Sequence, residues 1–305
     1  MADIDQIRIN FNEETLGLLN FCLAFLTFAV SLDISIKDFK NVFGHPKKVI
    51  VGLISQWILM PIFTITLILI FKPAPSIALG MVLVSACPGG NVSNYATHIA
   101  KGNTALSVTL TSFVTLFAIL ITPVSFSVVS AILPETQALL TKISLDPGSV
   151  VWTIMQLIVI PLIIGLSLNH FKPDWAAKIR KTVKIVSMVI FLGIIVAAVL
   201  ANIDNIIKYI YLVFILVLLH NGLAYALGYY FAKANKLPEA DARTVAIETG
   251  IQNAGLGLVL IFNFFPDLGG MMLVAAFWGV WDLLTVFLLA KWWERKPPSS
   301  ENVLA

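Results

Sequence analysis

Charged residues are scarce in this chain. Only 12% of its 305 residues are Asp, Glu, Lys or Arg, whereas soluble domains average about 25%. Hydrophobic residues make up 58% of the chain, and the mean hydropathy is +0.91. So few polar side chains cannot cover a soluble globule. The composition therefore predicts an all-α polytopic membrane protein that lies in a lipid bilayer.

Cysteine is scarce as well. The two cysteines, Cys22 and Cys87, both lie in apolar stretches, so a disulfide framework is not expected. Nucleotide-binding loops, metal-binding motifs and sets of Ser, His and Asp for catalysis are not evident. We therefore expect neither an enzyme nor a nucleic-acid-binding protein, and no obligate protein partner is evident. Residues 1–14 are acidic and polar and do not predict a cleavable signal peptide.

Long apolar stretches, separated by turn residues, predict nine transmembrane helices. Most of these stretches exceed the roughly 20 residues that a bilayer requires. They are residues 15–36, 46–71, 76–100, 104–133, 148–171, 178–201, 206–234, 240–265 and 268–292. Because nine is an odd number, the two ends of the chain are expected on opposite sides of the membrane.

The basic residues are divided unequally between those two sides. The nine-helix arrangement places sixteen of the twenty Lys and Arg residues on one side and only Arg8, Lys72, Lys142 and Lys208 on the other. Cytoplasmic segments carry the excess of Lys and Arg in membrane proteins. We therefore expect a multi-pass protein of the plasma (inner) membrane with residues 1–14 outside. Residues 293–305 form a cytoplasmic tail, and its Pro- and Ser-rich end is expected to be disordered.

Polar and flexible residues interrupt two of the predicted helices near their middle. Residues 85–94 read S-A-C-P-G-G-N-V-S-N, and residues 247–253 read I-E-T-G-I-Q-N. An interrupted helix persists in a membrane only where it is buried in protein or lines a cavity. An ionisable residue at that depth, Glu248, predicts a functional site that both helices share. Helices two to four and seven to nine match in opposite orientation, which is typical of the inverted repeats of secondary transporters.

The polar side chains near the interruptions offer oxygen atoms to a cation. They are Gln56, Ser93, Asn94, Ser107, Thr111, Glu248 and Gln252. A single carboxylate among neutral oxygens suits a monovalent hard cation, because calcium prefers more carboxylates and zinc prefers His or Cys. The pattern predicts a sodium site, or a proton carried by Glu248.

Several of these polar residues also have a purely structural interpretation. Ser107 and Thr111, four residues apart on one helix face, suit close helix packing. Gln56 suits a single hydrogen bond between helices. Cys87 suits a small packing position, and His220 in the seventh helix suits a contact between helices rather than a proton relay.

Four motifs resemble the bile acid:sodium symporter family in order and spacing, and the resemblance extends over nearly the whole chain. They are A-C-P-G-G-N-V-S-N-Y-A-T (residues 86–97), K-G-N-T-A-L-S-V-T-L-T-S (101–112), L-H-N-G-L-A-Y (219–225) and E-T-G-I-Q-N-A-G-L (248–256). The resemblance implies that the two discontinuous helices cross in a core domain. That domain comprises residues 46–133 and 206–292, and it lies beside a panel domain of residues 15–36 and 148–201.

The same resemblance implies two sodium sites that share one carboxylate. The first site maps onto Ser93, Asn94, Ser107, Thr111 and Glu248. The second maps onto Gln56, Glu248, Gln252 and the backbone carbonyls of Thr249 and Ile251. Asn253 matches a position that faces substrate, and we expect Asn91 and Asp282 beside it. The implied protein is a sodium-coupled symporter of a bile acid-like or smaller organic anion that works by alternating access.

The chain departs from the family pattern in two places. The ten-helix relatives have a first helix that has no counterpart here. The last helix has Asp282 where some relatives have His, and a carboxylate repels an anionic substrate unless it is protonated or paired. Bile acids are therefore in doubt as cargo, and smaller organic anions such as keto acids remain open.

Two other functions fit the same residues. One is a proton-coupled exporter related to the arsenite carriers, in which Glu248 carries the proton and the Cys87 thiolate binds the cargo. The other is a membrane receptor that binds its ligand without transporting it. Measurement of sodium-dependent uptake distinguishes these two from the symporter.

Overall fold

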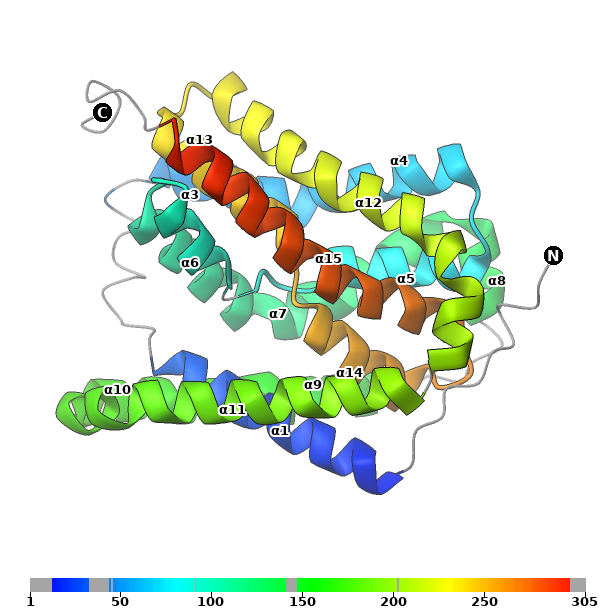
Figure 1. Ribbon diagram of the computed structural model, residues 1–305, viewed down its shortest axis with the longest axis horizontal. Coiled ribbons are helices and arrows are strands. Elements are labelled where there is room, and N and C mark those ends of the chain that lie inside the picture. The colour runs from blue at the N-terminus through cyan, green and yellow to red at the C-terminus, as the bar shows by residue number, and fades with distance from the viewer. Residues whose placement is uncertain are drawn as a thin grey trace.

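The computed structural model describes residues 13–32, 44, 46–90, 92–140, 147–201 and 203–296. All regular secondary structure in that part of the chain is helical (Figure 1). Six helical stretches there are long and apolar enough to cross a membrane, namely Pro46–Phe71, Thr104–Ile132, Val151–Phe171, Ile207–Ala234, Glu239–Phe264 and Gly269–Glu294. Leu16–Ser31 and Pro75–Ala86 are shorter apolar helices. The predicted class, an all-α polytopic membrane protein, is confirmed.

The elements follow the predicted order of apolar stretches. The first half of the chain forms α1 (Glu13–Ser31), α3 (Pro46–Ile54), η2 (Ser55–Leu59), α4 (Met60–Phe71), α5 (Pro75–Ala86), α6 (Val92–Ile99), α7 (Thr104–Ile132) and α8 (Pro134–Leu140). The second half forms α9 (Pro147–Ile154), η3 (Met155–Val159), α10 (Ile160–Phe171), α11 (Pro173–Ala201), α12 (Ile203–Ala234), α13 (Glu239–Gly250), α14 (Ala254–Phe264) and α15 (Gly269–Glu294).

Both predicted interruptions are present. α5 ends at Ala86 and α6 begins at Val92, while α13 ends at Gly250 and α14 begins at Ala254. Two features of the described helices differ from the sequence-based expectation by more than three residues. α11 begins at residue 173 instead of 178, because Pro173 suits the first position of a helix and Ala176 and Ala177 favour helix formation, although Pro173 and Asp174 lower the hydropathy. α8 lies where a connecting loop was expected. Residues 1–12, 33–36, 91 and 297–305 of the predicted segments lie outside the described residues.

Two wide helical turns precede prolines inside transmembrane stretches. In η2 the backbone N–H of Met60 donates to the carbonyl of Ser55, five residues earlier, and Pro61 follows at once. In η3 the N–H of Ile160 donates to the carbonyl of Met155, and Pro161 follows. A proline ring clashes with the carbonyl four residues before it in a regular α-helix, and a wider turn relieves that clash.

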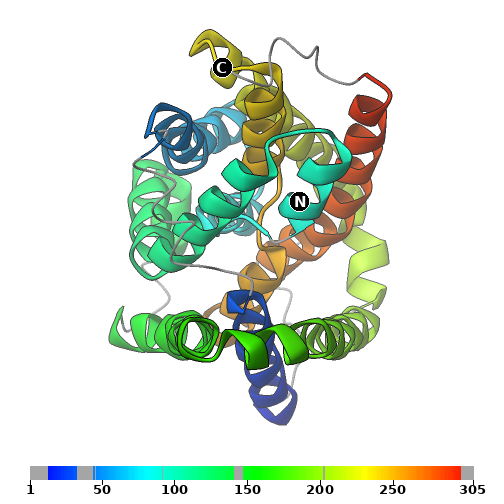
Figure 2. The same ribbon diagram turned by 90° about the vertical axis from the view of Figure 1, so that its left-hand side faces the viewer.

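The helices separate into two layers in both views. α1, α9, η3, α10 and α11 form one layer, and the remaining helices form the other (Figures 1 and 2). The packing within the first layer is close, because a Cβ atom at Gly165 of α10 would overlap the Ser31 hydroxyl oxygen of α1. The layers meet where α1 packs on α14 and where η3 packs on α7. Asn20 and Asn263 exchange side-chain amide hydrogen bonds of 3.1 and 2.9 Å at the first of these contacts.

The interrupted helices lie in the centre of the second layer. In the stretch Glu239–Phe264, 89% of the most apolar 18-residue segment is buried inside the protein. In the other five long apolar stretches, the buried share is 28% to 39%. Residues 76–86 of α5 are buried throughout. Bare backbone groups are therefore shielded from lipid at both interruptions, as a membrane protein requires.

Candidate cation site at the helix interruptions

The two interruptions touch each other. The backbone N–H of Asn253 donates a hydrogen bond of 2.8 Å to the carbonyl of Pro88. A Cβ atom at Gly90 would lie 3.1 Å from Cγ2 of Ile251, so glycine permits the close approach. Because the two interrupted segments are in direct contact, the polar residues of both line a single site.

Glu248 is the centre of this place and is fully buried. Ser93 of α6 donates a hydrogen bond of 2.6 Å to Oε1 of the carboxylate. Ser107 of α7 donates to the same oxygen, and Thr111 Oγ1 lies 3.1 Å from both carboxylate oxygens. Three hydroxyl groups from two helices thus converge on a carboxylate of a third.

This cluster has more acceptor oxygens than protons. Oδ1 of Asn94 also lies 2.8 Å from the Ser107 hydroxyl and 3.4 Å from the Thr111 hydroxyl. Each hydroxyl has one proton, which it can give to only one acceptor at a time. The remaining lone pairs, together with the negative charge of Glu248, form a set of oxygen ligands that suits a hard cation.

A second set of oxygens lies on the other side of Glu248. The Gln56 side-chain amide donates a hydrogen bond of 2.5 Å to the Glu248 carbonyl. The other amide atom, Oε1 of Gln56, is buried and has no hydrogen-bond partner among the described residues. A Cβ atom at Gly89 would lie 3.3 Å from the Gln56 amide nitrogen, 3.4 Å from Glu248 Oε2 and 3.6 Å from the Ile251 carbonyl oxygen. The absence of a side chain at Gly89 keeps the space between these groups free.

The remaining predicted ligands lie at the end of α13. The Gln252 side chain donates a hydrogen bond of 3.0 Å to the carbonyl of Thr249. The Thr249 hydroxyl lies 2.7 Å from the hydroxyl of Ser55 in η2, so the wide turn that carries Gln56 is fastened to the end of α13. The structure therefore brings Gln56, Thr249 and Gln252 to the same interruption.

The residues predicted to face substrate lie beside this interruption. The Asn253 side chain caps α14 by accepting a hydrogen bond of 2.9 Å from the N–H of Leu256. Asp282 of α15 is only 3% exposed, and its carboxyl faces the backbone amide of Gln252. Asn91 lies outside the described residues.

Two residues with structural alternatives occupy packing positions. Cys87 is buried, and a Cβ atom at Gly257 of α14 would lie 3.8 Å from its sulfur. His220 lies 2.8 Å from the Thr64 hydroxyl, which itself donates to the Met60 carbonyl at 2.8 Å and therefore accepts from Nε2–H of His220. The ring of His220 also meets Trp278 edge to face, with centroids 4.8 Å apart.

Comparison with known proteins identifies the family. The model of the sodium bile acid symporter family matches residues 20–209. The chain belongs to the sodium bile acid symporter family. This is a family of sodium-dependent transporters, so the chain is a membrane transporter rather than an enzyme, with sodium as its coupling ion.

Relatives of this symporter-family chain occur in bacteria and plants. The "Uncharacterized sodium-dependent transporter YocS" of Bacillus subtilis is 34% identical over 90% of this chain and 82% of its own length. The "Probable sodium/metabolite cotransporter BASS5, chloroplastic" of Arabidopsis thaliana is 30% identical over 90% of this chain and 68% of its own length. The rice protein "Probable sodium/metabolite cotransporter BASS2, chloroplastic" is 29% identical over 80% of this chain, which spans only 56% of that relative.

Proposed function

We propose that the protein is a sodium-coupled symporter of a small organic anion and that two sodium ions bind on either side of Glu248. The observation that carries this proposal is the fully buried Glu248 carboxylate, towards which hydroxyl and amide groups of three other elements, α6, α7 and η2, converge. A buried carboxylate without a cation is costly, and a bound sodium ion removes that cost.

The first ion is assigned to the oxygens of Ser93, Asn94, Ser107, Thr111 and Glu248. The second is assigned to Gln56, Glu248, Gln252 and the carbonyls of Thr249 and Ile251. The buried Gln56 oxygen without a partner supports the second assignment, because a buried acceptor in that state needs a ligand. The space that Gly89 leaves open between Gln56 and Glu248 supports it as well.

The substrate anion is assigned to the face that the interruptions present towards Asn253, Asn91 and Asp282. Half-helices that begin at an interruption direct N–H groups towards an anionic group. In this proposal the two ions order both interruptions and thereby complete the substrate face. Sodium binding and anion binding then favour the same conformation, which couples their transport.

The two layers are assigned to the two bodies of an alternating-access transporter. The core comprises residues 46–133 and 206–292, and the panel comprises 15–36 and 148–201. This assignment gives nine transmembrane helices in an inverted repeat, with the N-terminus outside and the C-terminus in the cytoplasm. The contact of Asn20 with Asn263 lies between the two bodies and changes when one moves against the other.

The number of ions decides how strongly the transporter accumulates its substrate. A tenfold sodium gradient supplies about 1.4 kcal/mol per ion, and 100 mV supplies about 2.3 kcal/mol for one net charge. Two ions with one monovalent anion carry one net charge, so the driving force is about 5 kcal/mol, enough for accumulation of several thousand-fold. One ion with the same anion is electroneutral and supports only about tenfold accumulation.

Uptake into proteoliposomes tests this proposal. Purified protein is reconstituted and offered a panel of radiolabelled organic anions, with an inward sodium gradient or an equal gradient of choline. The proposal expects uptake of at least one anion that requires sodium and is accelerated by an inside-negative potential. Uptake that follows a proton gradient instead would favour the exporter, and binding without uptake would favour a receptor.

A further inference from the structure

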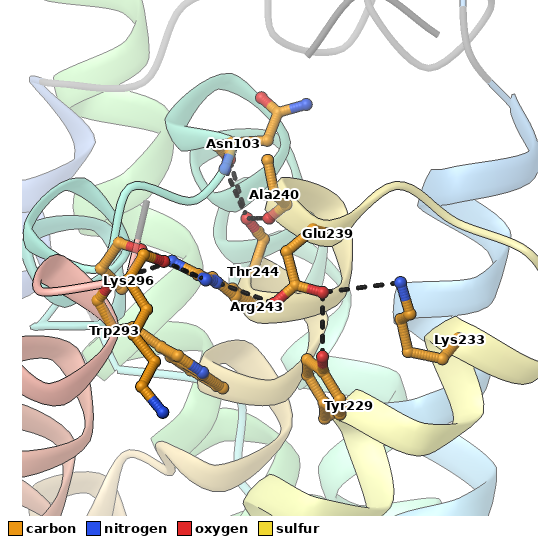
Figure 3. A network of polar contacts seen from close by, with 10 residues as sticks. Asn103, Tyr229, Lys233, Glu239, Ala240, Arg243, Thr244, Trp293 and Lys296 are labelled. Atoms are coloured by element: carbon orange, nitrogen blue, oxygen red, sulfur yellow. Dashed lines mark hydrogen bonds and ion pairs between the residues drawn. The ribbon is translucent and has the colours of Figure 1, made fainter. Parts of the chain in front are cut away.

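A second group of polar contacts joins the first turns of α13 to the turn between α6 and α7 (Figure 3). The backbone N–H of Asn103 lies 2.8 Å from the Thr244 hydroxyl and 3.2 Å from the Ala240 carbonyl. Thr244 is fully buried. A Cβ atom at Gly102 would lie 2.9 Å from the Thr244 hydroxyl oxygen, so a side chain there would push the turn away from α13.

The same two helices meet again one turn further along, at the candidate cation site. Ser107 lies four residues after Asn103, and Glu248 lies four residues after Thr244. Four residues in a helix advance about 6 Å and return to the same face. The Asn103–Thr244 contact and the Ser107–Glu248 contact are therefore successive steps along one line of contact. We call it the α7–α13 seam, formed by Asn103, Ser107, Thr111, Thr244 and Glu248.

Asp241 extends the seam towards a further element that carries a predicted ligand. Its carboxylate accepts a hydrogen bond of 2.6 Å from the Asn103 side chain and lies 3.4 Å from the ammonium group of Lys48. Lys48 belongs to α3, which continues directly into the η2 turn that carries Gln56. The start of α13 is thus linked both to the first turn of α7 and to the helix that supplies the second ion site.

Arg243 holds the end of α6, the short half-helix that carries Ser93. Its guanidinium is 4% exposed and donates hydrogen bonds of 2.9 Å to the Ala100 carbonyl, 3.1 Å to the Trp293 carbonyl and 2.6 Å to the Lys296 carbonyl (Figure 3). Ala100 follows the last residue of α6, a helix of only eight residues. So short a helix is not stable alone. Arg243 binds the carbonyl directly after its last residue and so holds the end of the helix that carries Ser93.

The position of α7 along α13 determines whether the hydroxyl oxygens around Glu248 are close enough to bind one cation together. Hydroxyl contacts of 2.6 to 3.1 Å depend on the axial position of α7 and α6 relative to α13. A slip of one residue along a helix displaces a side chain by about 1.5 Å and rotates it by about 100°. Contacts at the far end of the seam prevent that slip without touching the cation.

We propose that Thr244 and Asn103 are positioning residues that set sodium affinity by holding α7 in register with α13. The inference rests on the proposed function, because it requires that sodium binds at Glu248. It assigns to these two residues a role that is separate from ion coordination. Removing the Thr244 hydroxyl should weaken sodium binding even though the hydroxyl lies one helical turn away from the carboxylate.

The substitution pair Thr244→Val and Thr244→Ser tests this role. Valine keeps the branched shape and removes the hydroxyl, whereas serine keeps the hydroxyl. The sodium concentration for half-maximal thermal stabilisation is measured on purified full-length protein, with choline chloride to hold ionic strength constant. We expect it to rise about fivefold in Thr244→Val, the effect of one ordinary hydrogen bond, and to stay within about twofold of the wild-type value in Thr244→Ser.

Thr66→Val is the matched control, because the Thr66 hydroxyl donates to the Ile62 carbonyl of its own helix and is exposed. A merely structural role for Thr244 would lower the unfolding temperature without changing the half-maximal sodium concentration, and that result would overturn the inference. If Thr244→Val does not fold, Asn103→Ser replaces it. Serine keeps an oxygen that caps α7 but loses the contact with Asp241, so a rise of about twofold is expected.

The wild-type protein separates the two proposals. If sodium does not stabilise it at any concentration, the sodium site at Glu248 fails and the seam inference fails with it. If sodium stabilises the wild type and Thr244→Val at equal concentrations, only the seam inference fails.

Discussion

The substitution Glu248→Gln separates the charge of the candidate site from its shape. Glutamine has the same size as glutamate, and its amide oxygen still accepts from the hydroxyls of Ser93 and Ser107. The full negative charge is lost. We therefore expect a folded protein in which both proposed ions lose their only anionic ligand.

The expected loss of affinity follows from Coulomb's law. Unit charges about 4 Å apart interact with about 4 kcal/mol at an effective dielectric constant of 20. That energy corresponds to about three orders of magnitude in sodium affinity. For the wild type, sodium at a hundred times its dissociation constant adds about 2.7 kcal/mol to the free energy of unfolding. For Glu248→Gln, the same sodium concentration adds close to nothing.

The effect without sodium has the opposite sign. In choline buffer the wild type buries a carboxylate with no cation beside it, since none of the ion pairs in the described part of the chain involves Glu248. Replacing that group with a neutral amide removes a desolvation cost. Glu248→Gln should therefore unfold at the same temperature as the wild type or a higher one when sodium is absent.

Thermal unfolding of the purified protein at a series of sodium concentrations measures both effects. Glu248→Asp is the matched control, because it keeps the charge and shortens the side chain. Equal stabilisation of Glu248→Gln and the wild type by sodium would refute the shared carboxylate.

Three further predictions concern the second ion, the substrate and the movement of the layers. Gln56→Leu should leave sodium-dependent uptake in place but abolish the dependence of uptake on membrane potential. Patch-clamp recordings or potential-sensitive dyes on proteoliposomes detect that dependence. Continued charge movement during uptake would contradict a ligand role for Gln56. Asp282→Asn should lower the KM for an anionic substrate at a pH at which the Asp282 carboxyl is ionised, because the substitution removes that charge beside the Gln252 amide; a KM unchanged at every pH would place the substrate elsewhere. In the double variant Asn20→Cys, Asn263→Cys, oxidation to a disulfide should stop uptake and reduction should restore it. Uptake by the oxidised protein would show that α1 and α14 do not move apart.

The sequence was sufficient to locate both helix interruptions. Proline and glycine at residues 88–90 and glycine at residue 250 stand out because the surrounding residues are apolar, and the structure ends a helix within two residues of each. The four-residue spacing of Ser107 and Thr111 also predicts that both face the same way, and both lie against Glu248. These features depend on local chemistry, which a single sequence contains.

The supports of the site were not predictable in the same way. The hydrogen bond of Asn103 with Thr244 joins residues 141 positions apart, and the amide pair of Asn20 and Asn263 joins residues 243 positions apart. A polar residue near a helix end has many possible partners, and only the packed structure selects one. The four-residue spacing of Asn103 from Ser107, and of Thr244 from Glu248, is the signal that could have indicated the seam.

The wide turn before Pro61 illustrates the same limit. The proline is visible in the sequence and indicates a disturbed helix. What holds this turn in place is not visible there: the Ser55 hydroxyl in the turn lies 2.7 Å from the hydroxyl of Thr249 at the end of α13, 194 positions away. Neither residue is unusual in a transmembrane helix, so the sequence does not predict that contact.

That wide turn also bears on how the chain tolerates changes in length. The N–H of Met60 reaches back five residues to Ser55, so the turn holds one residue more than a regular α-helical turn. A single-residue deletion there would leave too few residues for the wide turn and would bring the ring of Pro61 against the carbonyl four residues before it. The segment would stay apolar, but the helix would kink, and Gln56, which lies in the turn, would move away from Glu248. The loss of one codon could in this way remove a proposed cation ligand without replacing any of the proposed ligand residues.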